Sequence, residues 1–187
     1  RFSNRVPRTV VRALVRAADR APVADGERPL TVLCARVGVA RAGSGSVPAA
    51  VFCRLHAALG RVVVGMGGTI GRAEGDALEA YFGAPLAADD DARRACRCAV
   101  RLLAAVRELD GRLALRIGVA SGACLAGDLG MPGLSGYAVL GPARDAAWQL
   151  ALACERFDAG VLATTAVWEA GGKDLVARML DRVALPT

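Results

Sequence analysis

The sequence predicts an α+β domain in which helices pack on a mixed, mainly antiparallel sheet. Segments with apolar residues at helical spacing alternate along the chain with short apolar runs that are typical of strands. One pair of such runs, separated by Gly75-Asp76, predicts a β-hairpin. Interleaved helices and strands that include a hairpin favour an α+β sandwich.

The composition is that of a folded domain with a core of small aliphatic side chains. The chain has 187 residues, of which 54% are apolar and only 4% aromatic. This hydrophobicity argues against disorder, and the length suffices for one domain with a sizeable core. The net charge of +6 comes almost entirely from arginines spread along the chain, and with so few aromatic side chains we expect no nucleic-acid partner.

The first part of the chain contains two predicted helices and one strand. Apolar positions at helical spacing predict helices over residues 8–20 and 47–59. Residues 30–37 form an apolar run that predicts a buried strand. A linker over 21–29 precedes this strand, and a flexible break at 41–46 follows it.

The predicted hairpin joins strands over residues 69–74 and 77–82. A two-residue turn between alternating runs is a strong hairpin signal, although the usual order is Asp-Gly rather than Gly-Asp. Asp76 at the tip has two interpretations, a turn residue or a ligand for a metal ion.

The second half of the chain alternates helices and strands. Three aspartates favour the start of a helix over residues 89–109, whose arginines predict a solvent-facing side. A strand at 113–122 then leads into a glycine-rich loop at 124–136. The remaining predicted elements are a strand at 137–141, a helix at 142–157 that opens on a proline, a strand at 160–164 and a short helix at 165–171.

The six cysteines do not have the spacing of a metal site. None belongs to a Cys-x-x-Cys motif, and the single histidine, His56, has no neighbour at ligand spacing. We therefore expect no zinc site, and interpret most of the cysteines as small buried apolar residues in a reducing compartment.

Three motifs, in order along the chain, match a known family. They are GGTIGRAEGDALEAYFGAP at 67–85, LRIGVASGACLAGDLG at 115–130 and GYAVLGPARDAAWQL at 136–150. The first follows a pattern that contains Gly-Asp-x-x-Met-Ala-x-Phe-Gly-Ala-Pro, and the third follows one that contains Gly-x-x-Val-Asn-x-Ala-x-Arg-Leu. With these motifs the chain resembles the catalytic domain of class III nucleotidyl cyclases, the adenylate and guanylate cyclases.

The resemblance implies a ferredoxin-like α+β domain that works as a dimer. It implies a lead-in helix and linker over residues 1–26 and a cyclase-homology domain over 27–187. The partner would be a second copy of the chain or another cyclase domain, with ATP as the nucleotide that the family uses. In the family, two aspartates of one protomer hold two Mg²⁺ or Mn²⁺ ions, and the product is a 3′,5′-cyclic nucleotide with release of pyrophosphate.

The family's two metal positions fall on Asp76, which keeps the carboxylate, and on Arg36, which loses it. An arginine cannot ligate a cation and stays charged at any relevant pH. We therefore expect no bound metal, and hypothesise that the guanidinium of Arg36 pairs with Asp76 in the space of the missing ions. The alternative is that Arg36 is an exposed strand-end residue.

The family positions that read the base and stabilise the transition state are altered as well. The resemblance places the family's base-reading lysine on Arg72 and its partner on Gly136, which has no side chain to read a base. The transition-state asparagine falls on Asp145 and the arginine on Gln149. In related phosphoryl-transfer reactions one such arginine is worth about 10³–10⁵ in rate.

Three functions remain open at this stage. One is a cyclase-homology domain without activity, acting as a dimerisation or regulatory module of a signalling protein. The alternative is a divergent adenylate cyclase that converts ATP to cyclic AMP and pyrophosphate. The third is nucleotide binding without turnover.

The chain begins at Arg1 rather than at methionine, so we expect a fragment of a longer protein. We expect a cytoplasmic location, either free or as the cytosolic part of a membrane-anchored protein. No apolar run reaches the length of about 18 residues that a membrane-spanning helix needs, so we expect no direct membrane contact by this fragment.

Overall fold

A computed structural model describes residues 26–39, 49–128, 137–171, 173 and 175–181. The predicted lead-in helix at 8–20 and the boundary of the lead-in segment lie outside these residues, as does the predicted break at 41–46. In the described part, no helix is long and apolar enough to cross a membrane.

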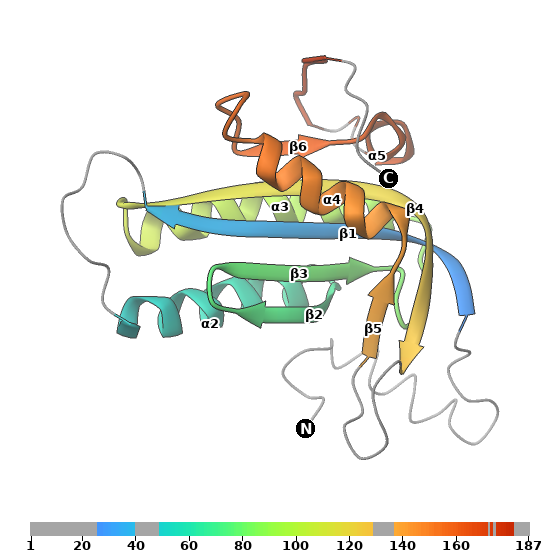
Figure 1. Cartoon of the computed structure of the whole chain (residues 1–187), viewed down its shortest axis with the longest axis horizontal. Coiled ribbons are helices and arrows are strands. Elements are labelled where there is room, and N and C mark those ends of the chain that lie inside the picture. The colour runs from blue at the N-terminus through green and yellow to red at the C-terminus, as the bar shows by residue number, and fades with distance from the viewer. Residues whose placement is uncertain (1–25, 40–48, 129–136, 172, 174, 182–187) are drawn as a thin grey trace.

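A mixed sheet forms the centre of the domain (Figure 1). Its strand order is β2-β3-β1-β4-β5, and β6 pairs with β4 in parallel while the other pairs are antiparallel. The strands are β1 (Gly26–Val39), β2 (Thr69–Glu74), β3 (Ala77–Phe82), β4 (Leu113–Asp128), β5 (Tyr137–Leu140) and β6 (Val161–Ala163). The prediction of a mixed, mainly antiparallel sheet is therefore confirmed.

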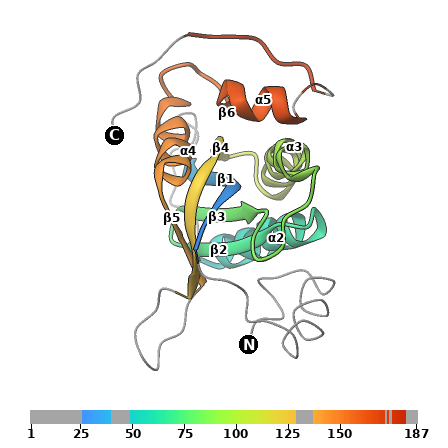
Figure 2. The same cartoon turned by 90° about the vertical axis from the view of Figure 1, so that its right-hand side faces the viewer.

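Helices cover both faces of the sheet (Figure 2). The helices α2 (Ala49–Gly65) and α3 (Asp91–Leu109) lie on one face, with α5 (Thr165–Gly171) beside α3. Among the described helices, α4 (Pro142–Ala153) is the one that lies on the other face. It crosses β4 at Gly118, where an added Cβ would collide with the helix backbone.

Alternate residues of the central strands separate the core into two parts. On β1, Leu33 and Ala35 face α2 and α3, whereas Val32 and Cys34 face α4. This alternation follows from the two-residue period of a strand that is covered on both sides. Arg36 has the parity of Cys34 and lies on the α4 face of the sheet.

Four predicted boundaries were wrong by four residues or more. The helix predicted over 142–157 ends at Ala153. The helix predicted to end at 59 continues to Gly65, because Leu59 and Val63 extend its buried stripe. The strand predicted to end at 122 continues to Asp128, so part of the expected loop pairs with β1 and β5. β1 begins at Gly26, inside the expected linker, and includes Pro29. β3 starts to pair only at Thr31, so Pro29 lies in an edge segment, where proline is tolerated.

The prediction that the arginines of α3 face solvent was wrong for Arg94. Arg93, Arg97 and Arg101 are exposed, but Arg94 is largely buried. Its guanidinium binds Asp90 and Asp91, donates to the carbonyls that end α2 and lies over the ring of Phe82.

Candidate functional site

The hairpin tip brings Arg36 and Asp76 into contact. Gly75 occupies the first turn position with a φ of 58°, which suits glycine and explains the Gly-Asp order. The N–H of Val37 donates to the carbonyl of Asp76 at 2.8 Å and so ties the turn to β1. As a result, Nη2 of Arg36 lies 2.9 Å from Oδ2 of Asp76, and Nε of Arg36 lies 3.3 Å from the same oxygen. The predicted pairing of the two residues is confirmed.

The ion pair keeps Asp76 ionised. The hydrogen bond from Arg36 lowers the pKa of the Asp76 carboxyl below its usual value, burial opposes this effect, and the charge of Arg36 adds to the lowering. The two side chains are about half exposed, at 48% and 50%. The pair is therefore a solvent-accessible contact on the sheet surface.

Arg72, the predicted base-reading position, is also paired. Its Nε lies 2.7 Å from Oε1 of Glu74 on the same strand. After a bulge at Gly71, Arg72 stands opposite Glu79 of β3. Gly136, its expected partner in base recognition, lies outside the described residues.

The two altered transition-state positions lie on α4. Asp145 is exposed in the first turn of the helix, and its carboxylate lies 3.5 Å from Nη1 of Arg144. Gln149 follows one turn later and is half-buried. In the described part of the chain, no hydrogen bond or ion pair joins Asp145 or Gln149 to Arg36 or Asp76.

A buried carboxylate that the sequence analysis missed lies between the hairpin and α4. Glu79 is only 2% exposed and faces α4 from β3. It accepts hydrogen bonds from Nε of Arg144 at 3.0 Å, from the indole N–H of Trp148 at 2.9 Å and from the hydroxyl of Tyr81. Arg144 therefore bridges the buried Glu79 and the exposed Asp145.

The signal for this network was present in two separate motifs. Glu79 stands where the family pattern has Met, and Arg144 stands where it has Val. An acidic residue inside the otherwise apolar strand ALEAYF needs a buried donor, because an unpaired buried charge is strongly unfavourable. Only the fold shows that Arg144, which replaces the Val of the family pattern, supplies that donor.

The network also suppresses ionisation of its neighbours. Burial, followed by the nearby negative charge of Glu79, raises the pKa of the Cys34 thiol and of the Tyr81 hydroxyl far above their usual values. Cys34 is therefore an apolar residue of the core rather than a nucleophile. Of the six cysteines, only Cys53 is exposed, in agreement with the predicted packing role of most of them.

Solved structures that share this fold are nucleotidyl cyclase domains. The guanylyl cyclase Cya2 superposes with a TM-score of 0.66 at 25% identity, over 80% of this chain and 81% of its own. The adenylyl cyclase CyaB from P. aeruginosa gives 0.71 at 21% identity, over 82% and 85%. A dimeric guanylyl cyclase domain of a RhoGC fusion protein from the fungus Blastocladiella emersonii gives 0.61 at 21% identity, over 76% and 83%.

No protein-family model and no curated protein sequence matches the chain. The structural matches nevertheless confirm the resemblance that the three motifs predicted. The chain has the fold of the class III adenylyl and guanylyl cyclase catalytic domains.

The donor set at the hairpin does not fit a divalent cation. Mg²⁺ prefers oxygen ligands at near-ideal geometry, and here one carboxylate is already bound by a guanidinium. The guanidinium charge of Arg36 also repels a divalent ion here, although water at this half-exposed pair screens much of the repulsion. Within the described residues, no three histidine, cysteine or acidic side chains form a ligand cluster.

Proposed function

We propose that this chain is a cyclase-homology domain without cyclase activity, which acts as a dimerisation or regulatory module of a signalling protein. The observation that carries the proposal is the ion pair between Arg36 and Asp76. At the two positions where the resemblance implies metal-binding carboxylates, one side chain is a cation that neutralises the other.

The chemistry of the remaining positions supports the same conclusion. Asp145 adds a negative charge where the family uses a neutral amide near an anionic substrate, and Gln149 lacks the charge that would stabilise the transition state. Arg72 is engaged by Glu74, so its charge is partly neutralised before any nucleotide arrives. Metal binding, base recognition and charge stabilisation are therefore impaired together.

Two arginines on this face connect elements of the domain. Arg36 ties the hairpin tip to β1, and Arg144 ties α4 to β3 through Glu79. A rigid face of this kind suits a module whose role is to pair with another cyclase domain. The RhoGC cyclase domain has been solved both as a non-canonical dimer and as a monomer, so dimerisation is compatible with the fold.

The deciding experiment measures cyclic nucleotide production. The purified chain is incubated with ATP or GTP and Mn²⁺, alone and mixed with an active class III cyclase domain, beside that active domain and a boiled sample. We expect no product above the boiled sample from the chain alone, and no added product from the mixture. Turnover of ATP above that background would establish the alternative, a divergent adenylate cyclase that forms cyclic AMP and pyrophosphate, and turnover of GTP would equally overturn the proposal.

A further inference from the structure

A cavity of about 930 Å³ lies along β6, at the edge of the sheet. β6 pairs with β4 on one side and with no described strand on the other. The cavity follows this free side, between Leu150 of α4 on one flank and Val100 of α3 and Trp168 of α5 on the other. The position beside β6 therefore lies between two helical layers (Figure 2).

The free side of β6 presents unpaired backbone groups. In the parallel pair with β4, the N–H of Thr164 donates to the carbonyl of Val119 at 3.1 Å. Backbone groups of successive strand residues point alternately to the two sides of the strand. Val161 and Ala163 therefore direct their N–H and C=O groups away from β4, and in the described part of the chain no strand receives them.

This edge lacks the features that protect other edge strands. Proteins commonly blunt an edge with charged side chains, a bulge or a covering segment. β2, another edge strand of the sheet, has a bulge at Gly71 and carries the charges of Arg72 and Glu74. β6, Val161–Ala163, is apolar throughout. An unprotected edge of this kind favours pairing with a further strand.

The side chains around the cavity are apolar and accessible. Of the eight large apolar side chains that are exposed on the described surface, four line this cavity: Val100, Val176, Met179 and Leu180. Clustered exposed apolar side chains mark an interaction surface. An acyl chain would cover them but would bury the backbone groups of β6 without hydrogen bonds, which is unfavourable. An extended peptide satisfies both the side chains and the backbone.

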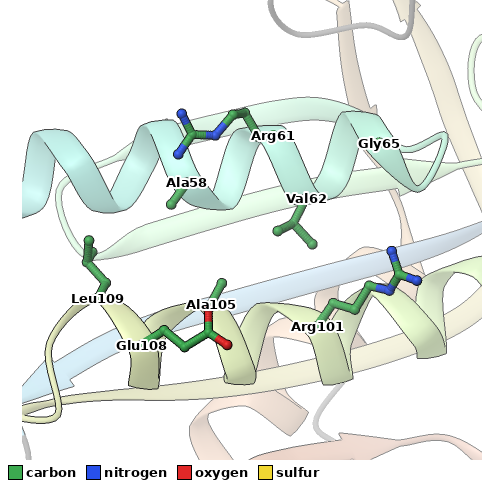
Figure 3. A pocket seen from close by; sticks show the side chains of 8 residues that line it. All are labelled: Ala58, Arg61, Val62, Gly65, Arg101, Ala105, Glu108 and Leu109. Atoms are coloured by element: carbon green, nitrogen blue, oxygen red, sulfur yellow. The ribbon is translucent and has the colours of Figure 1, made fainter.

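The groove between α2 and α3 differs in this respect (Figure 3). It is smaller, about 530 Å³, and the charged side chains of Arg61, Arg101 and Glu108 surround it. Its walls are helices, whose backbone groups are bonded within each helix. Of these two cavities, only the one along β6 offers a strand edge.

We propose that the free edge of β6 binds one extended apolar segment of a partner protein as an added strand. Its side chains would alternate between the wall of α4 and the wall of α3 and α5. Because both walls are apolar, the segment needs apolar residues at every position, as in a strand that is covered on both faces. The chain's own residues 175–181 fit poorly, since Arg178 in their middle would place a charge against one of these walls.

The probe is a fluorescent peptide of about seven residues, with valine, isoleucine and alanine between terminal lysines. Fluorescence anisotropy with the full chain measures its binding. A control peptide has the same side chains but methylated backbone nitrogens, and should bind at least about tenfold more weakly because it cannot donate to β6. Hydrogen exchange at the amides of Val161 and Ala163 should slow when the first peptide binds.

Two variants locate the binding site. Ala163→Pro removes one outward N–H and leaves the bonds of β6 to β4, which come from the neighbouring residues. It should weaken binding at least about tenfold, whereas Ala163→Val keeps the N–H and should not. Val100→Asp puts a charge on one wall without touching β6 and should also weaken binding. Its matched control is Leu86→Asp, at an exposed leucine outside the cavity.

Four results would overturn the proposal. The first three are no binding up to about millimolar peptide, equal binding of the methylated peptide, and equal binding by the cavity variants and their controls. The fourth is slow exchange of Val161 and Ala163 in the free chain. If Met179→Pro abolished that protection, the edge would belong to residues 175–181, and if protection rose with protein concentration, it would belong to a second copy. None of these outcomes depends on whether the chain has cyclase activity.

Discussion

Arg36 and Asp76 are half exposed, which limits what their ion pair contributes to stability. Exposed pairs are worth about 0.2–1 kcal/mol because water and salt screen them. The pair therefore matters more for what it prevents, the approach of a cation to Asp76, than for the free energy of unfolding.

A single substitution at Arg36 separates metal binding from catalysis. In Arg36→Asp two carboxylates face each other, so we expect weak Mn²⁺ binding by calorimetry where the wild type shows none. Cyclic nucleotide production should stay at background, because Asp145 and Gln149 are unchanged. Arg36→Ala removes the guanidinium without adding a ligand and serves as the control. If Arg36→Asp alone produced cyclic nucleotide, Asp145 and Gln149 would not be what prevents activity.

The lowered pKa of Asp76 predicts a pH-dependent contribution to stability. A carboxyl whose folded pKa lies below its unfolded pKa stabilises the fold above the unfolded value, about 4, and loses that effect as pH falls through the folded pKa. Urea unfolding of wild type and Asp76→Asn should differ by up to about 1 kcal/mol at neutral pH, and the difference should shrink as pH falls and vanish once the carboxyl is protonated in the folded chain. A difference that persists in acid would assign the effect to the turn rather than to the ion pair.

At the scale of elements, the buried Glu79 couples β3 to α4. Removing one partner of a buried ion pair costs about 3–5 kcal/mol, whereas replacing both by apolar residues is often neutral. We expect Arg144→Val to destabilise the chain most, because it leaves a carboxylate that is 2% exposed without its cation. Glu79→Met should cost less, since Arg144 keeps Asp145 and partial access to water.

The double variant Glu79→Met with Arg144→Val restores the residue types of the family pattern and should recover most of the stability. Urea unfolding of the four proteins gives the coupling energy, and Trp148 fluorescence reports the loss of its hydrogen bond to Glu79. Additive effects of the two substitutions would show that the pair does not act as a unit.

The hairpin and Glu79 show which features of this chain could be predicted from its sequence and which could not. The hairpin was predictable because turn, alternation and register are local properties of residues 69–82. The pairing of Arg36 with Asp76 was predictable only through the family resemblance, which placed two distant positions together. The Glu79 network was missed because it depends on how α4 lies across the sheet. The length of β4 was missed because its glycines suggest a loop, until pairing on both sides extends the strand.

At the scale of the whole molecule, the ribbon of β4 and β5 extends away from the rest of the sheet (Figures 1 and 2). Leu125 and Leu140 stand opposite each other on this ribbon and are both exposed, at 43% and 50%. A pair of adjacent exposed leucines is unfavourable in water and is relieved by contact with another protein surface.

If the chain acts by dimerisation, this ribbon is one exposed apolar part of the described surface that a dimer interface would bury. Sedimentation velocity over a range of concentrations should show a monomer–dimer equilibrium for the wild type. Leu125→Asp with Leu140→Asp should shift it toward the monomer by at least about tenfold in Kd, since charges would replace buried apolar area. Leu86→Asp, at another exposed leucine before α3, should leave it unchanged. A wild type that stays monomeric at the highest concentration would remove the homodimer and leave pairing with a different cyclase domain as the form in which the module acts.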